Sequence, residues 1–443
     1  MRSMNRFQVV LATALAAPVL AASGFAQSLP PVPGSQVINI TPTPGTFTEP
    51  GVAVNPNNPK QVVVVLQYTA KAAYTEDGGQ TWHLDSTGVA PLNYRMSGDV
   101  SVAFDNKGHA IMDCIAFDKL GSFNYWGHGA TRNGIFQRRS LDGGKTWETQ
   151  LRTVSAFPTK PGIPFEDKPY IVADDSPQSP HAGNLYVGWT RWTLTDSRML
   201  FSRSTDDGVK WSKPIEISQT RGLPRDDNGA LEGFDGVVGP KGTLYGVWSA
   251  DDEIVLTESH DGGKTFTPSR NIVHTAPTMF AVDGMDRANG FPQIADDPKN
   301  GELYVTWSDY RNGDVDIFLS RSTDHGATWS APVKVNNDPK HDGADHFFQW
   351  LAVDPVTGAV NVVFYDRREN PHKQIVVLAR STDHGATFNN YAWTNTPFSG
   401  KDVFMGDYLG LAAYGGKVYG AWPVHPQGAK GTILQIGEAN FNK

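Results

Sequence analysis

The feature that most constrains this chain is a short motif, Ser/Thr-x-Asp-x-Gly-x-Thr-Trp/Phe, that recurs six times with small variations along its 443 residues. Its clearest copy, RSTDHGATW, spans residues 321–329, and successive copies lie 55 to 65 residues apart. A fixed motif at such a period is typical of an array of similar structural units. The motif aspartates are Asp77, Asp142, Asp206, Asp261, Asp324 and Asp383.

Each part of the motif suits a tight turn between two β-strands. The aspartate can accept hydrogen bonds from the backbone N–H groups that follow it. The glycine two positions later, for example Gly326, can adopt the left-handed backbone conformation. The threonine then begins the next strand, and the aromatic residue after it can turn inward as an anchor. Such a turn satisfies its own polar groups, so it needs no bound ligand.

The segments between the motifs predict a β-propeller. Upstream of each motif lie two apolar runs separated by Asp, Asn, Pro and Gly, which indicates a hairpin, and a third strand leads into the motif. A fourth strand leaves it, so each unit is a four-stranded antiparallel meander, and such units arranged radially form a propeller. The 45 glycines and 30 prolines fit many short strands joined by turns. We therefore expect one large all-β domain.

The number of blades depends on the two ends of the chain. After the sixth motif, a last unit begins at Leu409 and has three strands and no motif. Residues 36–42, QVINITP, could supply the missing fourth strand and so join the first and last blades. This arithmetic favours seven blades. Six is the alternative, if the terminal strands fold into the first blade or lie outside the ring.

Residues 1–26 have the pattern of a secretory signal peptide. Arg2 and Arg6 precede an apolar stretch, residues 9–22, that is shorter than the ~20 residues of a membrane span. We expect cleavage after Ala26, a linker with the possible ring-closing strand over residues 27–47, and the propeller domain over residues 48–443. The mature protein should then be secreted or periplasmic, not inserted in a membrane, and monomeric.

Charge and cysteine content exclude other classes of protein. The net charge of −8 provides no basic surface for nucleic acid. Cys114 is the single cysteine, so no internal disulfide can form.

With its motifs laid out, the chain resembles the Asp-box, or BNR-repeat, propellers, whose best-known members are sialidases. The six motifs carry this resemblance over nearly all of the expected mature chain. It implies a glycoside hydrolase of the exo-α-sialidase type, in which three arginines hold the substrate carboxylate and an aspartate is the acid/base. A tyrosine assisted by a glutamate is the nucleophile in such enzymes. This chain departs from the family pattern before the first motif. The family has a Phe/Tyr-Arg-Ile-Pro segment there, whereas residues 46–54 of this chain, TFTEPGVAV, contain no arginine. Seven blades would also exceed the six of sialidases.

Propeller geometry predicts where a site should lie. The loops that join strands three and four carry the motifs, whereas the loops from strand two to three and from four to one open at the opposite face, around the channel. Carboxylates occupy nearly the same place ahead of the innermost strand in five units: Glu49, Asp99, Asp167, Glu232 and Asp407. Crowded carboxylates raise one another's pKa, which suits a general acid. Such a ring could equally cap backbone N–H groups or bind water and a cation in the channel.

The connecting loops add candidate substrate-binding residues. Arg95, Arg225 and Arg287 could hold a substrate acid, because arginine binds carboxylates through two parallel hydrogen bonds. Trp126, in the aromatic loop over residues 117–134, could stack on a sugar ring. Asp309 with Arg311, and Asp366 with Arg368, are expected to form local ion pairs instead.

The resemblance supplies only the residue types of the catalytic groups, and the position of each residue in the loops suggests which role it would take. Asp99 or Asp167 would be the acid/base, and Tyr408, helped by Glu232, would be the nucleophile. Glu49 and Asp407 would complete the substrate-binding ring.

The function predicted from the sequence is therefore an exported sialidase-like glycoside hydrolase acting on terminal acidic sugars of glycans. Two alternatives remain open: a non-catalytic propeller that binds glycans or proteins at the cell surface, and a propeller polysaccharide lyase acting on uronates. We expect no cofactor and no metal. The segment HDGADH over residues 341–346 has metal-binding residue types but matches no zinc pattern.

Overall fold

The computed structural model describes residues 28–67, 71–85, 94, 96–122, 125–159, 164–276 and 279–442. The expected signal peptide, residues 1–26, lies outside these residues, as does Arg95. The backbone of Trp126 is described, but its side chain is not.

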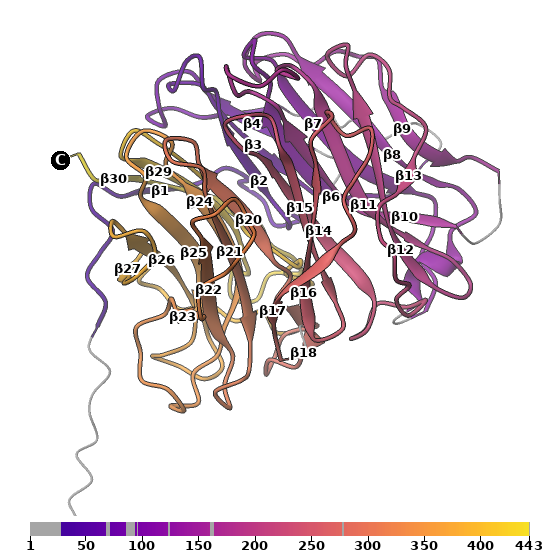
Figure 1. The fold of residues 1–443 in the computed structure, drawn as a ribbon. Coiled ribbons are helices and arrows are strands. Elements are labelled where there is room, and N and C mark those ends of the chain that lie inside the picture. The colour runs from indigo at the N-terminus through magenta and orange to yellow at the C-terminus, as the bar shows by residue number, and fades with distance from the viewer. Residues whose placement is uncertain are drawn as a thin grey trace, which may run out of the picture.

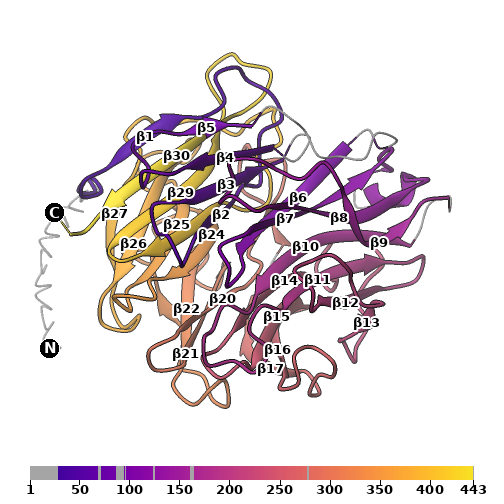
Figure 2. The same cartoon turned by 90° about the horizontal axis from the view of Figure 1, so that it is seen from above.

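The described chain forms seven four-stranded antiparallel sheets arranged as the blades of a propeller (Figures 1 and 2), as the sequence predicted. In each blade the innermost strand contacts the innermost strands of the two neighbouring blades, and these strands line the channel. The blades, from the innermost strand outward, are β2 (Gly51–Val54), β3 (Val62–Leu66), β4 (Lys71–Thr75), β5 (His83–Leu84); β6 (Met96–Phe104), β7 (Ala110–Phe117), β8 (Asn133–Ser140), β9 (Arg152–Phe157); β10 (Phe165–Ala173), β11 (Leu185–Trp192), β12 (Ser197–Ser204), β13 (Ile215–Glu216); β14 (Leu231–Val238), β15 (Leu244–Ala250), β16 (Glu253–Ser259), β17 (Arg270–His274); β20 (Gln293–Asp297), β21 (Glu302–Asp309), β22 (Asp316–Ser322), β23 (Val333–Lys334); β24 (His346–Val353), β25 (Val360–Asp366), β26 (Ile375–Ser381), β27 (Asn389–Ala392); and β28 (Gly410–Tyr414), β29 (Lys417–Val424), β30 (Ile433–Asn440), β1 (Gln36–Asn39).

Two small elements lie outside the blades. The 3-10 helix η1 (Trp126–Gly129) follows β7, and the two-residue strands β18 (Met279–Phe280) and β19 (Ala288–Asn289) form a hairpin between blades four and five. Among the described residues no helix is long and apolar enough to cross a membrane.

The ring is closed by the N-terminal strand, as the sequence predicted. Strand β1 pairs antiparallel with β30, with Gln36 opposite Glu438 and Asn39 opposite Gln435. The indigo β1 and the yellow β30 therefore lie side by side in Figure 1. Because the two ends of the chain share one sheet, the seventh blade cannot form until both are in place.

The six motifs all lie between the third and fourth strands of their blades. In the fifth blade, Asp324 accepts a hydrogen bond from the backbone N–H of Thr328 at 2.8 Å and from its hydroxyl at 2.5 Å. The hydroxyl of Ser322 in turn accepts from the N–H of Gly326, whose φ is 87°. The same bonds recur around Asp383. The motif is thus a self-contained turn, as predicted.

Removing one motif aspartate should affect stability and not function, because the motifs lie on the face away from the channel mouth. We expect Asp383→Ala to destabilise the fold by about 1 kcal/mol, the usual effect of losing a side chain that caps backbone N–H groups. Chemical denaturation would measure it, with Glu369→Ala, an exposed position outside the motifs, as the control. A loss of activity without a loss of stability would contradict this placement.

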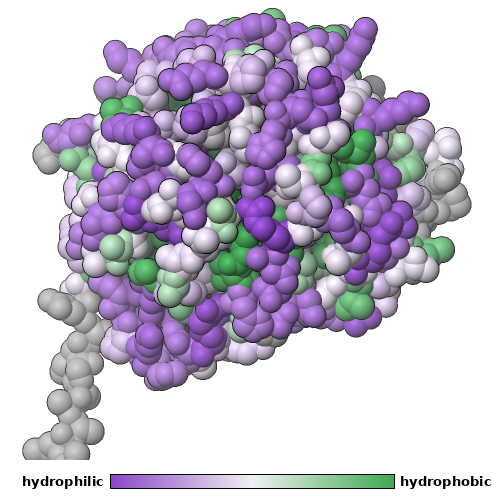
Figure 3. Space-filling model, viewed as in Figure 1, coloured by the Kyte–Doolittle hydropathy of each residue, from purple (hydrophilic) through white to green (hydrophobic). Residues whose placement is uncertain are grey.

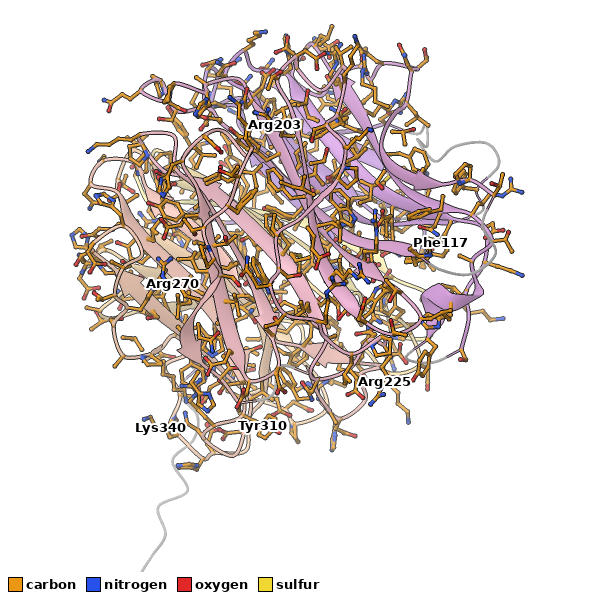
Figure 4. All side chains as sticks on the ribbon, turned by 45° about the vertical axis from the view of Figure 1, so that its right-hand side comes forward. Phe117, Arg203, Arg225, Arg270, Tyr310 and Lys340 are labelled. Atoms are coloured by element: carbon orange, nitrogen blue, oxygen red, sulfur yellow. The ribbon has the colours of Figure 1, made fainter. Side chains whose placement is uncertain are left out.

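The hydrophobic core lies between the blades. Four tryptophans of second strands are almost completely buried there: Trp189, Trp248, Trp307 and Trp422. The visible outer face is mostly hydrophilic, with apolar residues in small groups between charged ones (Figure 3). In Figure 4, Arg225, Tyr310 and Lys340 mark the lower face, formed by the two-to-three and four-to-one loops, and Arg203 lies toward the opposite, motif-bearing face.

Candidate active site at the channel mouth

The innermost strands are irregular where they reach the lower face. Four of them, β6, β10, β14 and β24, shift register by a β-bulge near their first residues. The bulge places Asp99 at φ 44° and Lys168 at φ 48°. Such left-handed angles are uncommon for residues other than glycine, and bulges re-aim side chains next to functional sites. They turn these side chains into the channel mouth.

The predicted carboxylate ring exists and is buried. Glu49, Asp99, Asp167, Glu232 and Asp407 are each at most 7% exposed. The nearest carboxylate oxygens of Glu49, Asp99 and Asp407 all lie within 4.8 Å of one another. The sequence thus located these five side chains correctly.

Asp407 is held ionised by two cations. Its Oδ1 accepts from Arg287 Nε at 2.7 Å, and its Oδ2 accepts from Lys168 Nζ at 3.0 Å. Burial alone would raise the pKa of Asp407, but the charges of Arg287 and Lys168 outweigh burial and lower it to about 2. Arg287 also donates to Asp226 at 2.7 Å.

The carboxyl groups of Asp99 and Asp167 interact directly, and burial raises the pKa of both. For Asp167, burial and then the neighbouring charge of Asp99 raise the pKa well above its usual range. Trp192 donates its indole N–H to Asp167 Oδ2 at 2.7 Å and fixes the carboxyl in place. Both carboxyls thus favour their protonated forms more than an exposed aspartate does.

The pKa values of the other two carboxyl groups, Glu49 and Glu232, are also raised. Burial and then Asp99 raise the pKa of Glu49, and burial and then Asp226 raise the pKa of Glu232. One ionised carboxylate, Asp407, therefore lies among carboxyls that favour their protonated form. This separation of pKa values within one site is the pattern of acid and base pairs in enzymes.

Tyr408 lies beside this cluster, with its ring 5.5 Å from that of Trp350. Its hydroxyl donates to the carbonyl of Val100 at 3.3 Å. Burial and the negative charges of Glu49 and Asp99 raise the pKa of the Tyr408 phenol well above its usual range. The surroundings thus keep this hydroxyl protonated. Its predicted role as nucleophile stays a prediction.

The structure describes two of the three candidate arginines, and they do not meet at one point. Arg287 reaches the carboxylate cluster, whereas Arg225 pairs with Asp227 in its own loop at 3.1 Å. Arg95 and the Trp126 side chain lie outside the described part of the chain. The predicted local pairs are confirmed: Arg311 Nε is 2.8 Å from Asp309, and an Arg368 nitrogen is 2.7 Å from Asp366.

Sequence reasoning missed Lys168. Its ammonium lies 4.8 Å from the centre of the Phe291 ring and 5.3 Å from that of Tyr408, between two aromatic faces. Burial would lower its pKa, but Asp407 and Asp99 raise it instead. The only signal in the sequence was its position directly after Asp167. That signal was misleading, because a regular strand turns two successive side chains to opposite faces, and only the β-bulge brings both into the site.

Two hollows are present near this face. The cavity at the cluster, lined by Lys168, Trp350, Asp407 and Tyr408 among others, measures about 30 Å³, room for one or two waters. A larger groove of about 1120 Å³ runs between blades six and seven, but Asp402 is its single carboxylate. The groove therefore cannot supply two carboxyl groups, and the cluster at the channel mouth is the candidate active site.

No protein-family model matches the chain. A protein named sialidase from Bacteroides fragilis (strain YCH46) is 27% identical over 243 residues, which are 46% of this chain and 42% of that protein. The chain thus matches less than half of that relative's length.

Solved structures share the fold. The Hadza microbial sialidase Hz136 superposes with a TM-score of 0.53 at 15% identity, over 86% of this chain and 73% of that one. An α-L-arabinanase from Penicillium chrysogenum, complexed with arabinobiose, gives a TM-score of 0.51 at 11% identity over 93% of this chain and 99% of that one. At such identities the likeness concerns the fold alone. The fold of this chain is thus a sialidase-like β-propeller, which is the architecture expected from the motifs.

Proposed function

We propose that this protein is an exported glycoside hydrolase whose catalytic groups are the carboxyls at the channel mouth. One observation carries the proposal: oxygens of Asp99 and Asp407 lie within 4.8 Å of each other, and Arg287 and Lys168 lower the pKa of Asp407 whereas burial raises the pKa of Asp99. Hydrolysis of a glycosidic bond needs one carboxyl that gives a proton and one carboxylate that stabilises or attacks the sugar carbon. The sialidase-like fold and the Bacteroides relative support the same reaction class.

In the proposed reaction the two carboxyl groups act on one sugar ring in two steps, with retained configuration. Oxygens of Asp99 and Asp407 lie within 4.8 Å of each other, and retaining enzymes hold their two carboxyls close together. Asp407 bonds to the anomeric carbon while the Asp99–Asp167 pair passes its proton to the departing glycosidic oxygen. A water oxygen then bonds to that carbon, its proton returns to the pair, and Asp407 leaves.

Arg287 controls access to Asp407 in this scheme. It donates to both oxygens of Asp407, and the cavity that Asp407 lines measures only about 30 Å³, too small for a sugar ring. Arg287 comes from the β18–β19 loop between blades four and five, so movement of this loop would uncover Asp407. A sugar ring could then replace the waters.

The proposal is tested with the purified mature protein and a set of fluorogenic glycosides. The set includes an α-sialoside, because the sequence predicts a terminal acidic sugar, and α-L-arabinofuranosides. Asp167→Asn is expected to lower kcat/KM by about 10²–10⁴-fold, the usual contribution of an acid/base group, and Asp407→Asn, which removes the attacking carboxylate, by at least as much. Nuclear magnetic resonance would identify the first anomer released.

Other results would redirect the assignment. Full activity in Asp407→Asn would remove the channel mouth from consideration. An unsaturated uronate product would identify a lyase. Sugar binding without release of any product would favour the non-catalytic propeller.

A further inference from the structure

The channel mouth is crowded with acids, and this bears on the charge of the sugar that it can accept. Among the residues that the structure describes, six carboxyl groups gather there against two cations, Lys168 and Arg287. The six are Glu49, Asp99, Asp167, Asp226, Glu232 and Asp407, each at most 7% exposed. Even with the raised carboxyls protonated, Asp407 and Asp226 compensate both cations.

Both cations are already paired with carboxylates. Arg287 directs Nε and one terminal nitrogen at Asp407 and the other terminal nitrogen at Asp226. Lys168 donates to Asp407 at 3.0 Å and lies between the rings of Phe291 and Tyr408. A carboxylate entering here would have to share these cations with Asp407 and Asp226.

The described arginines of the surrounding loops are also engaged. Arg225 pairs with Asp227, and Arg191 Nε donates to Glu166 at 3.0 Å. Arg367, which is 2% exposed, donates to the carbonyl of Asp283 at 2.6 Å and to Gln374 at 3.1 Å. A carboxylate clamp, as the sequence predicted for an acidic sugar, is therefore not formed by these side chains.

From this arrangement we infer that the substrate sugar is neutral. The inference rests on the proposed function and narrows its substrate class. Sugar hydroxyls can donate to Asp407 and exchange hydrogen bonds with the protonated carboxyls, whereas a substrate carboxylate finds both cations already compensated by Asp407 and Asp226. A neutral sugar is therefore favoured, because the site leaves the charge of an acidic sugar without a counter-charge of its own.

Activity on natural glycans tests the inference directly. The protein is incubated with mixed plant and animal polysaccharides, and released sugars are separated by charge and identified by mass spectrometry. We expect neutral sugars only. Release of sialic acid or of a uronic acid as the main product would overturn the inference. Release of no sugar at all is instead the failure of the proposed hydrolase.

A second measurement does not depend on catalysis. Thermal unfolding is followed with sodium glucuronate or N-acetylneuraminate, against sodium chloride at the same ionic strength. We expect no specific shift for the wild type and a rise in melting temperature for Asp226→Asn, because this variant frees one side of Arg287. Asp227→Asn, which removes the charge paired with Arg225 at 3.1 Å and leaves Arg287 unchanged, is the matched control and should behave as the wild type. Stabilisation of the wild type by either sugar acid would overturn the inference, as would an Asp226→Asn variant that does not respond.

Discussion

Replacing Lys168 by methionine should destabilise the protein by about 3–5 kcal/mol, the usual cost of removing one partner from a buried ion pair. Methionine keeps the length of the side chain and its packing between Phe291 and Tyr408 but removes the charge. Asp407, 4% exposed, would then keep Arg287 as its single direct cationic partner. The proposed hydrolysis should fall as well, since Asp407 would be less firmly held in its ionised form.

An exposed ion pair provides the control for this variant. Lys107 lies 2.6 Å from Asp207, but its side chain is 52% exposed, and Lys107→Met should cost at most about 1 kcal/mol. Chemical denaturation at neutral pH compares the two variants. Equal and small losses would show that Lys168 contributes nothing beyond a surface pair. The double variant Lys168→Met, Asp407→Asn should recover part of the stability, because it removes both charges together.

The pH dependence of this variant has a definite sign. The folded pKa of Asp407 is lowered to about 2, so its stabilisation is present above the ordinary aspartate pKa of ≈ 3.9 and is lost as the pH falls toward 2. Without Lys168 the folded pKa of Asp407 rises toward its ordinary value. Acid unfolding of Lys168→Met should therefore begin at a higher pH than that of the wild type.

The sequence predicted the frame of the molecule because its signals are local. Each motif turn closes through bonds within a few residues, such as those of Asp324 to Thr328. The strand at residues 36–42 was recognised because the last unit lacked one strand. The five ring carboxylates were found for a similar reason, since each stands at the same point of a repeated unit.

The pairing of charges at the channel mouth was not predictable in the same way. Asp407 meets Arg287 across 120 residues and Lys168 across 239 residues of sequence. Such partners depend on the closed ring and on the β-bulge that turns Lys168 inward, at φ 48°. The local pair of Arg225 with Asp227, two residues away, was hidden by the expectation that this arginine binds substrate.

His346 should make the stability of the wild type fall between pH 6.5 and 9. His346 is the first residue of β24, and its side chain is fully buried. Its Nε2 lies 3.4 Å from an oxygen of Asp338 and 3.4 Å from an oxygen of Asp366. Burial would lower the pKa of His346, but the charges of Asp366 and Asp338 raise it to about 9. The imidazole is thus a cation at neutral pH.

The surroundings of His346 form a balanced set of charges. The groups are contributed by strands and loops of blades five and six and comprise Asp316, Asp338, Asp366, Lys334 and Arg368, with Asp342 and Asp345 nearby. Three carboxylates, Asp316, Asp338 and Asp366, face two cations, Lys334 and Arg368. A protonated His346 is the third cation, so the positive charges then equal the three negative ones. This balance explains the group without a bound metal, although oxygens of Asp316 and Asp338 lie within 4.8 Å of the His346 ring nitrogen.

The sign of the pH effect follows from the raised pKa. Stabilisation by the His346 cation is complete below its ordinary pKa of 6.5 and is lost as the pH rises through the folded value of about 9. The difference corresponds to about 3 kcal/mol, at 1.36 kcal/mol for each pKa unit. His346→Gln, which fills the site without a charge, should therefore be less stable than the wild type at pH 6, and the gap should close above pH 9.

Urea denaturation of both proteins at pH 6 and pH 9.5 measures this gap, and taking the difference between them removes the pH effects that they share. His372→Gln is the matched control, because His372 also pairs with an aspartate, Asp283, but its side chain is 73% exposed. That variant should follow the wild type at both pH values. If His346→Gln and the wild type instead lost stability in parallel with pH, His346 would be neutral in the fold, and three buried carboxylates would share the charge of Lys334 and Arg368 alone.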